Sequence, residues 1–163
     1  MRIGLAVARL ASAAWVGAAV LFVITAVREV RHPGFDSATK DTLALLRFPA
    51  YYALGFMVVS VALAASIFGM IGRKKGKRRR FVVAVWLLGV VLVLMVADFV
   101  AIYLPIVGMI TPVGRARSAE FAGYHRASIL INVCGVGLCA IAAALLSWEN
   151  PQNDSAQGAW RKD

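Results

Sequence analysis

The chain is poor in charged residues, and acidic residues are the scarcest of them. Only 16% of its 163 residues are charged and only 8 are Asp or Glu, whereas 61% are hydrophobic. A soluble domain contains about 25% charged and about 45–50% apolar residues, and a chain this short has no core large enough to bury the excess. The composition therefore excludes an ordinary soluble domain and favours an integral membrane protein.

Cysteine and the common catalytic motifs are also scarce. The two cysteines, Cys134 and Cys139, lie five positions apart in one apolar segment, so they point in different directions on a helix. This spacing excludes a disulfide between them, a CxxC redox pair and a zinc site. GxSxG, HExxH, P-loop and GxGxxG motifs are missing as well. The sequence thus favours a protein that is not an enzyme.

Four apolar stretches are each long enough for a membrane helix, which needs about 20 apolar residues. They cover residues 3–27, 48–72, 81–110 and 124–148. We expect the first to be kept as a helix rather than cleaved as a signal peptide, because it is long and Arg9 interrupts it. The pattern predicts an all-α fold: an integral membrane four-helix bundle in one domain, residues 1–149. The polar tail, residues 150–163, is expected to be disordered.

Most of the positive charge falls in one short run between the second and third stretches. Short basic loops stay in the cytoplasm, so the run predicts that this loop and both termini are cytoplasmic, in a multi-pass protein of the inner (plasma) membrane. Its position between two membrane segments argues against nucleic acid as a partner. We expect it to contact anionic lipids of the bilayer. The run consists of Arg73, Lys74, Lys75, Lys77, Arg78, Arg79 and Arg80.

Prolines and turn residues interrupt the apolar pattern. His32-Pro33-Gly34 is a turn signal, and Asp36-Ser37 is suited to cap a short interfacial helix that runs to about Arg47. Pro49 suits the first turn of the second membrane helix. Pro105 should kink or end the third helix, which would leave residues 106–118 irregular at the outer surface.

Asp98 is the most informative polar residue, because a carboxylate inside a membrane helix is costly and rare. We expect it to pair with a cation from a neighbouring helix, first Arg47, with Arg126 and His125 as the other candidates. A structural ion pair and a proton, metal or substrate site both stay open. Arg9, near the other surface, either extends to lipid phosphates or has a buried partner.

The fourth stretch carries a polar stripe at helical spacing. The stripe predicts either a seam between helices, where small and hydroxyl side chains pack closely, or an outer-side pocket. The pocket would be lined by Asp98, Tyr103, His125, Ser128 and Asn132, with Arg47, Tyr51 and Tyr52 beside it. The stripe itself consists of Phe121, His125, Ser128, Asn132 and Cys139, and a ladder of small residues continues it through Gly135, Ala143 and Ser147.

The two histidines of the chain, His32 and His125, are expected on the same outer side. Two histidines from different helices can ligate a haem iron. Haem b is therefore an alternative cofactor, although His32 follows a helix end rather than lying within a helix. Our first expectation is that the protein has no cofactor.

Three segments together resemble a known family. Leu10–Gly17 reads L-x-x-A-x-W-x-G, Asp98–Ile106 closes the third stretch, and Phe121–Asn132 reads F-x-x-x-H-x-x-S-x-x-x-N. Over about residues 5–148 the chain is similar to the small four-helix membrane proteins related to transmembrane protein 205, a domain of unknown function. The resemblance implies the same fold and makes Phe121, His125, Ser128 and Asn132 the first positions to test. The basic loop departs from that pattern.

The sequence therefore predicts a non-enzymatic bundle that binds a small ligand, lipid or partner protein at an outer-side polar cluster of Arg47, Asp98, Tyr103, Phe121, His125, Ser128 and Asn132. A haem-binding oxidoreductase using His32 and His125 is one alternative. An oligomeric transporter subunit centred on Asp98 is another. A homo-oligomer and a membrane partner protein both remain open.

Overall fold

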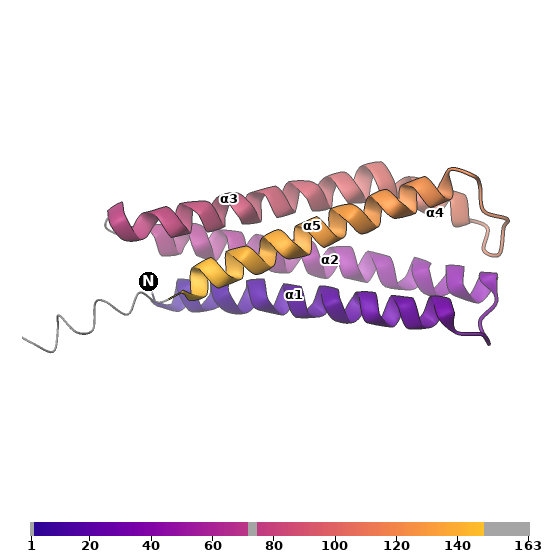
Figure 1. The fold of residues 1–163 in the computed structure, drawn as a ribbon, viewed down its shortest axis with the longest axis horizontal. Coiled ribbons are helices and arrows are strands. Elements are labelled where there is room, and N and C mark those ends of the chain that lie inside the picture. The colour runs from indigo at the N-terminus through magenta and orange to yellow at the C-terminus, as the bar shows by residue number, and fades with distance from the viewer. Residues whose placement is uncertain (1, 72–74, 149–163) are drawn as a thin grey trace, which may run out of the picture.

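A computed structural model describes residues 2–71 and 75–148 of the chain and, in those residues, contains helices and no strands. Four long rods run side by side (Figure 1). The first two are α1, Arg2–Arg31, and α2, Ser37–Met70. The third consists of α3, Lys75–Asp98, the π-helical turn η1, Phe99–Tyr103, and α4, Leu104–Ile110. The fourth is α5, Phe121–Ser147.

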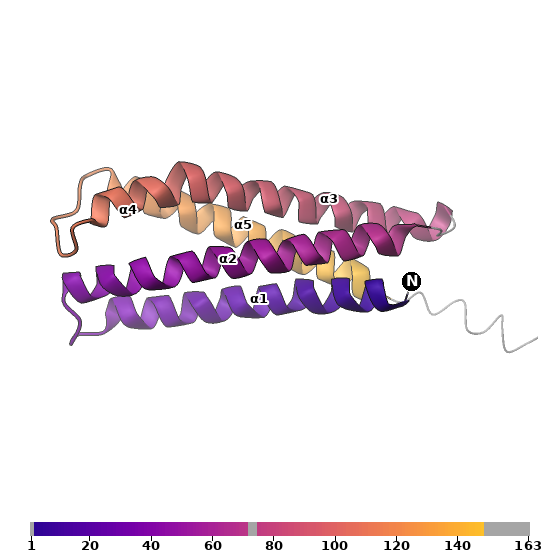
Figure 2. The ribbon, with the colours of Figure 1, turned by 180° about the vertical axis from the view of Figure 1, so that it is seen from behind.

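The rods form an antiparallel ring. The closest packing is of α1 with α2 and of α3 with α5, and contacts of α2 with α3 and of α1 with α5 close the ring (Figures 1 and 2). We call the end with the turns 32–36 and 111–120 the loop end. The opposite end, where α1 starts, α2 ends and α5 ends, is the terminal end.

All four rods are long and apolar enough to cross a membrane. The spans Ile3–Arg31, Ser37–Met70, Arg79–Ile110 and Phe121–Ser147 each contain an 18-residue stretch with a mean hydropathy between 2.2 and 2.7. Large apolar side chains such as Leu21, Val93 and Leu130 face outward. The sequence-based prediction of an all-α four-helix bundle is confirmed at this level.

Small residues occupy much of the interior. Ala8, Ala62, Ala84 and Ala142 are fully buried. Without a solvent-driven hydrophobic effect, helices in lipid associate through close backbone approach, which small side chains permit. The inversion, with small residues inside and large apolar residues outside, suits a bundle surrounded by hydrocarbon.

Gly55 of α2 lets two large side chains meet inside this narrow core. A Cβ atom at this position would lie 2.5 Å from Cη2 of Trp15 and would also collide with Cε of Met95. Trp15 of α1 is only 2% exposed and packs against Tyr51, with their ring centroids 5.0 Å apart. The missing side chain of Gly55 is therefore the space that the Trp15 indole fills.

The expectation of a separate short helix before Pro49 is wrong. Residues from Ser37 onward belong to α2, and Pro49 lies inside that helix. Proline removes one helical hydrogen bond, but here α1 extends to Arg31 and supports the segment. Arg47 forms an ion pair with Glu29 of α1, and its guanidinium lies 5.1 Å from the ring centroid of Phe22. These contacts hold α2 against α1 on the loop side of Pro49.

The third rod likewise continues through Pro105, contrary to the expectation that residues 106–118 are irregular. The helix runs to Ile110, and only 111–120 form the loop. The π-helical turn η1 precedes the proline, and the Leu104 N–H bonds to the Phe99 carbonyl, five residues back. A proline ring clashes with the carbonyl four residues before it. The wider π turn makes room for that ring.

The terminal end is tied together by α1 and α5. Arg9 Nε donates to the Leu146 carbonyl at 2.7 Å, so Arg9 has a protein partner, one of the two alternatives for it. Cys139 is buried with its Sγ 3.7 Å from the Ser12 carbonyl, whereas Cys134 is exposed. Of the predicted small-residue ladder, Gly135 and Cys139 are buried, and Ala142 and Leu146 continue the buried face in place of Ala143 and Ser147.

Several predictions fall on parts that the structure does not describe. Arg73, Lys74 and the 150–163 tail lie outside the described residues, as do the side chains of Lys75, Lys77 and Arg78. Of the basic run, Arg79 is exposed, and Arg80 donates to the Trp148 carbonyl at 2.9 Å.

Candidate functional site

A buried carboxylate, Asp98, forms the centre of the polar cluster. Its side chain comes from the last residue of α3, immediately before η1, and is 1% exposed. Tyr52 of α2 donates its hydroxyl to Asp98 Oδ2 at 2.6 Å, and Asn132 of α5 donates its Nδ2 to the same oxygen at 2.7 Å. Ser128 lies one turn before Asn132 and reaches Oδ2 at 3.3 Å. Three helices therefore converge on one oxygen atom.

Asn132 links this carboxylate to a second tyrosine. Tyr51 donates to Asn132 Oδ1 at 2.9 Å, and Asn132 Nδ2 also bonds to the Ser128 carbonyl at 2.9 Å. We call Tyr51, Tyr52, Asp98, Ser128 and Asn132 the Asp98 cluster. It joins α2, α3 and α5 by hydrogen bonds in a region where water is scarce, so each bond restricts how the three helices can move against one another.

The second oxygen of Asp98 differs from the first. Oδ1 is buried and has no hydrogen-bond partner among the described residues. The predicted pairing with Arg47 is wrong, because Arg47 binds Glu29, and no ion pair joins Asp98 to any cation in the described part of the chain. Hydroxyl and amide donors, rather than a cation, stabilise this carboxylate.

Aromatic rings surround the cluster. Tyr52 packs against Phe99 and Tyr103, with ring centroids 5.1 and 5.0 Å apart, and Tyr51 stacks on Phe22 at 4.2 Å. Tyr103, a predicted site residue, thus reaches the cluster through ring contacts and makes no hydrogen bond with Asp98. Aromatic packing of this kind fixes the two tyrosine hydroxyls in position.

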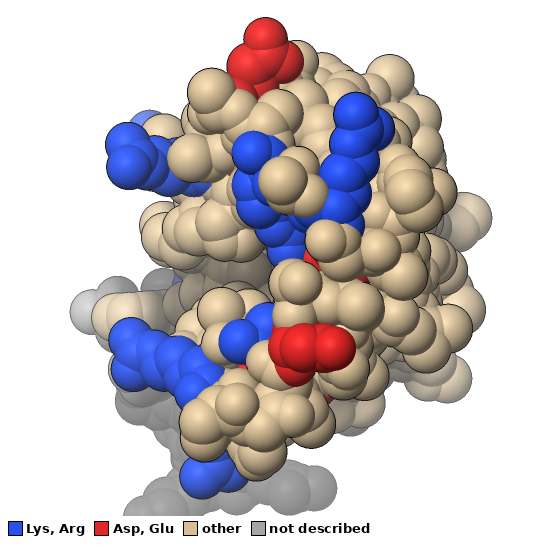
Figure 3. Space-filling view, turned by 90° about the vertical axis from the view of Figure 1, so that its right-hand side faces the viewer, with Lys and Arg blue, Asp and Glu red and all other residues tan. Residues whose placement is uncertain are grey.

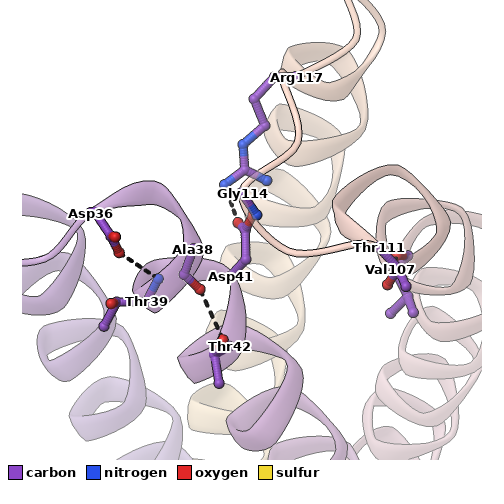
Figure 4. Close-up of polar contacts among 9 residues, drawn as sticks. All are labelled: Asp36, Ala38, Thr39, Asp41, Thr42, Val107, Thr111, Gly114 and Arg117. Atoms are coloured by element: carbon purple, nitrogen blue, oxygen red, sulfur yellow. Dashed lines mark hydrogen bonds and ion pairs between the residues drawn. The ribbon is translucent and has the colours of Figure 1, made fainter.

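A second buried carboxylate, Asp41, organises the loop end. It is 1% exposed and accepts a hydrogen bond from the Gly114 N–H at 3.0 Å and one from Arg117 (Figure 4). Gly114 has a φ of +78°, which favours glycine, and a Cβ there would lie 3.2 Å from Cβ of Ala38. Asp41 therefore ties the 111–120 loop to α2.

The N-cap of α2 lies beside this contact. Asp36 accepts a hydrogen bond from the Thr39 N–H at 2.8 Å (Figure 4). Hydrogen bonding by Thr39 holds the pKa of the Asp36 carboxyl below its ordinary value. The cap fixes the point where the chain turns from the 32–36 loop into α2.

A groove of about 790 Å³ lies between the loop-end halves of α1 and α5. Its walls are largely apolar, from Val20, Val23 and Val27 of α1 to Ile129 and Val133 of α5. Tyr51, Tyr52, Ser128 and Asn132 also line it, so its floor is one side of the Asp98 cluster. Its volume falls within the range of about 300–1,000 Å³ usual for small-molecule sites.

The groove exists because α1 and α5 diverge. They are in contact at the terminal end, through Cys139 and Ser12 and through Arg9 and Leu146. Toward the loop end α5 crosses over to the α4 side, away from α1, and the end-on surface is hollowed there (Figures 1 and 3).

The other predicted site residues lie along the groove rather than at Asp98. Phe121 and His125 stack on each other at the start of α5, with ring centroids 5.9 Å apart, and both line the groove. Arg47 lines it too, at the loop end. His32 is not among the lining residues, and its Nδ1 accepts the Gly34 N–H at 3.2 Å. The haem alternative thus finds only His125 at the groove.

Sequence reasoning found Asp98, Ser128 and Asn132 but missed Asp41. The 28–47 segment shows a nearly balanced mixture of charges, which hides the fact that Asp41 is buried while Asp36 is exposed. No spacing rule connects Asp41 with Arg117, because two membrane-length helices separate them in sequence. The apolar run that predicts the second helix starts only at residue 48, so it gave no sign that Asp41 is buried.

Comparison of the chain with protein-family models, with curated proteins and with solved structures finds no match. What the chain does must therefore be inferred from the groove and the Asp98 cluster themselves.

Proposed function

We propose that the chain is a multi-pass membrane protein that binds a small amphipathic ligand in the groove between α1 and α5. The observation that carries this proposal is the groove itself, with apolar walls on two helices and a hydrogen-bonding floor at the Asp98 cluster. Ligand sites combine a mostly apolar lining with a few fixed polar groups in this way. No set of catalytic residues accompanies it in the described residues, so we propose binding rather than chemistry.

The proposed orientation puts the terminal end in the cytoplasm. The start of α1, the end of α2, the start of α3 and the end of α5 gather at that end (Figure 1). In the sequence the basic run falls between α2 and α3, and basic loops remain on the cytoplasmic side. The groove then opens within the outer half of the membrane. The similarity to the transmembrane protein 205 family remains a prediction that agrees with this topology.

A pair of tryptophan substitutions tests the proposal. Val133 and Leu130 are neighbouring, outward-facing residues of α5, 64% and 65% exposed, but only Val133 lines the groove. We expect Val133→Trp to remove the small molecules that co-purify with the protein in mild detergent, identified by mass spectrometry of the extract. Leu130→Trp should keep them. Equal retention by both variants would argue against a ligand in this groove.

The cluster at the floor allows a second test. Asn132→Ala removes the bonds to Tyr51 and Asp98, and His125→Ala removes a ring from the groove wall. Both should weaken ligand retention, and Asn132→Ala should also lower stability. If both variants were as stable and as ligand-loaded as the wild type, the cluster would have no part in binding.

A transporter subunit centred on Asp98 is the second candidate, favoured by one observation. Asp98 Oδ1 is buried and has no hydrogen-bond partner among the described residues, which leaves an acceptor for a proton or small cation. Intramembrane carboxylates commonly mark such pathways. Flux of protons or monovalent cations into proteoliposomes should then depend on Asp98. Flux that is the same in wild type and in Asp98→Asn would remove this candidate.

A further inference from the structure

The charges at the loop end of the groove do not balance. Two acids, Glu29 and Asp41, and four cations, Arg31, Lys40, Arg47 and Arg117, line the groove. Arg47 binds Glu29, and Arg117 binds Asp41. These two ion pairs use both acids and leave two cations.

Arg31 and Lys40 are the cations left over. Arg31 is the last residue of α1 and Lys40 lies in the first turn of α2, so both stand at the mouth of the groove. Neither forms an ion pair with an acid in the described part of the chain. Asp36 does not line the groove and is engaged by Thr39 as the helix cap, although the charge of Lys40 also helps to lower the pKa of Asp36. The residues that line the mouth of the groove therefore include two cations that form no ion pair among the described residues.

The groove has the depth of one membrane leaflet. Its α1 wall runs from Ala19 to Arg31, which at 1.5 Å per residue is about 18 Å. Half of the hydrocarbon thickness is about 15 Å. The cations stand at the loop-end limit of this apolar wall, where a lipid headgroup would lie.

Resting on the proposed function, we infer that the ligand is an anionic phospholipid whose phosphate lies between Arg31 and Lys40 and whose acyl chain follows the apolar wall. Arg and Lys both bind phosphate, Arg through two parallel N–H groups. A zwitterionic headgroup would bring its own cation to a positively charged mouth. A second copy of this chain docked here would bring the same unpaired cations, and like charges would then face each other.

The test compares phosphatidylglycerol with phosphatidylcholine. The full-length protein in detergent receives either lipid, and native mass spectrometry measures how much stays bound. A photoreactive phosphatidylglycerol, cross-linked and mapped by peptide, locates the site. The key variant is Arg31→Gln with Lys40→Gln. Its matched control is Arg28→Gln with Arg115→Gln, which removes the same charge from exposed positions of the same end that do not line the groove.

We expect wild type and control to prefer phosphatidylglycerol, with the label on α1 and α5 beside the groove. The Arg31/Lys40 variant should bind it roughly 30-fold more weakly, which corresponds to about 1 kcal/mol for each cation removed near the surface. Its affinity for phosphatidylcholine should change little, and it should fold normally because both side chains lie at the mouth of the groove rather than in the core.

Four outcomes would overturn the inference. If wild type bound both lipids equally and Val133→Trp lost both, the preference for an anionic headgroup would be refuted, but the groove would remain a lipid site. Retention of both lipids in Val133→Trp would refute the groove as well. A preference that persists in the Arg31/Lys40 variant but disappears in Arg79→Gln with Arg80→Gln would place the anionic lipid at the terminal end. Cross-links between two copies in place of the lipid label would show that another chain covers the groove.

Discussion

Removal of one hydroxyl group tests whether the Asp98 cluster stabilises the bundle. Tyr52→Phe deletes the 2.6 Å bond to Asp98 Oδ2 and leaves the aromatic packing in place. A hydrogen bond to a charged group contributes about 1.5–3 kcal/mol in soluble proteins. Bonds between membrane helices average about 0.6 kcal/mol and reach about 1.7 kcal/mol. Because Tyr52 is only 3% exposed, water cannot replace the lost donor. We expect a loss of about 1–2 kcal/mol.

Reversible unfolding in mixed micelles with increasing denaturing detergent measures this loss. Tyr103→Phe is the matched control, since Tyr103 packs against Tyr52 but its hydroxyl has no hydrogen bond with any described residue. Its substitution should be nearly neutral. In the background of Asp98→Asn, the effect of Tyr52→Phe should shrink, because the carboxyl group that accepts the bond is gone. A loss below about 0.3 kcal/mol, or equal losses for both tyrosines, would refute the idea that this bond stabilises the cluster.

Three further perturbations address other parts of the fold. Gly55→Ala should destabilise the folded protein by about 1–3 kcal/mol through overpacking. Gly17→Ala should be tolerated, because nothing lies within 4 Å of the added Cβ atom. Thermal unfolding monitored by circular dichroism would compare the two variants. Asp41→Asn should make the 111–120 loop more sensitive to limited proteolysis, and unchanged cleavage would show that the ion pair does not order the loop. The Asp36 cap should stabilise the start of α2 at pH values above the ordinary carboxyl pKa of 3.8, and this stabilisation should be lost as the pH falls through the lowered pKa of the folded state. Hydrogen exchange of the first α2 amides should therefore rise at low pH, and Asp36→Ala should remove that pH dependence.

The sequence predicted the rods better than their ends. Apolar length locates a membrane helix because the hydrocarbon thickness sets it, and this holds for all four spans. It does not tell where a helix stops in the polar region. Pro49 and Pro105 suggested boundaries, but neighbouring contacts, including the Arg47–Glu29 pair, carry α2 through Pro49, and a π turn carries the third rod through Pro105.

For the polar site, the sequence likewise predicted some features correctly and others wrongly. The helical spacing of Ser128 and Asn132 correctly put them on one face, and both reach Asp98. The expected partner Arg47 was wrong, because charge complementarity alone does not say which acid a cation reaches. Glu29 lies on α1, the helix that α2 packs against most closely, whereas Asp98 is surrounded by hydroxyl and amide donors. Three-dimensional packing decides between two acids that the sequence treats as equal.

The contact between α1 and α5 at Cys139 acts as a pivot for this pair of helices, which separate from there toward the loop end. Cys139 does not line the groove, yet the Ser12–Cys139 contact is where the two helices approach before they separate. From Cys139 to His125 the lever arm along α5 is about 21 Å, at 1.5 Å per residue. A small change of angle at the pivot is therefore amplified at the opening. The volume of the buried Cys139 side chain is therefore expected to influence the width of the groove, although Cys139 does not line it.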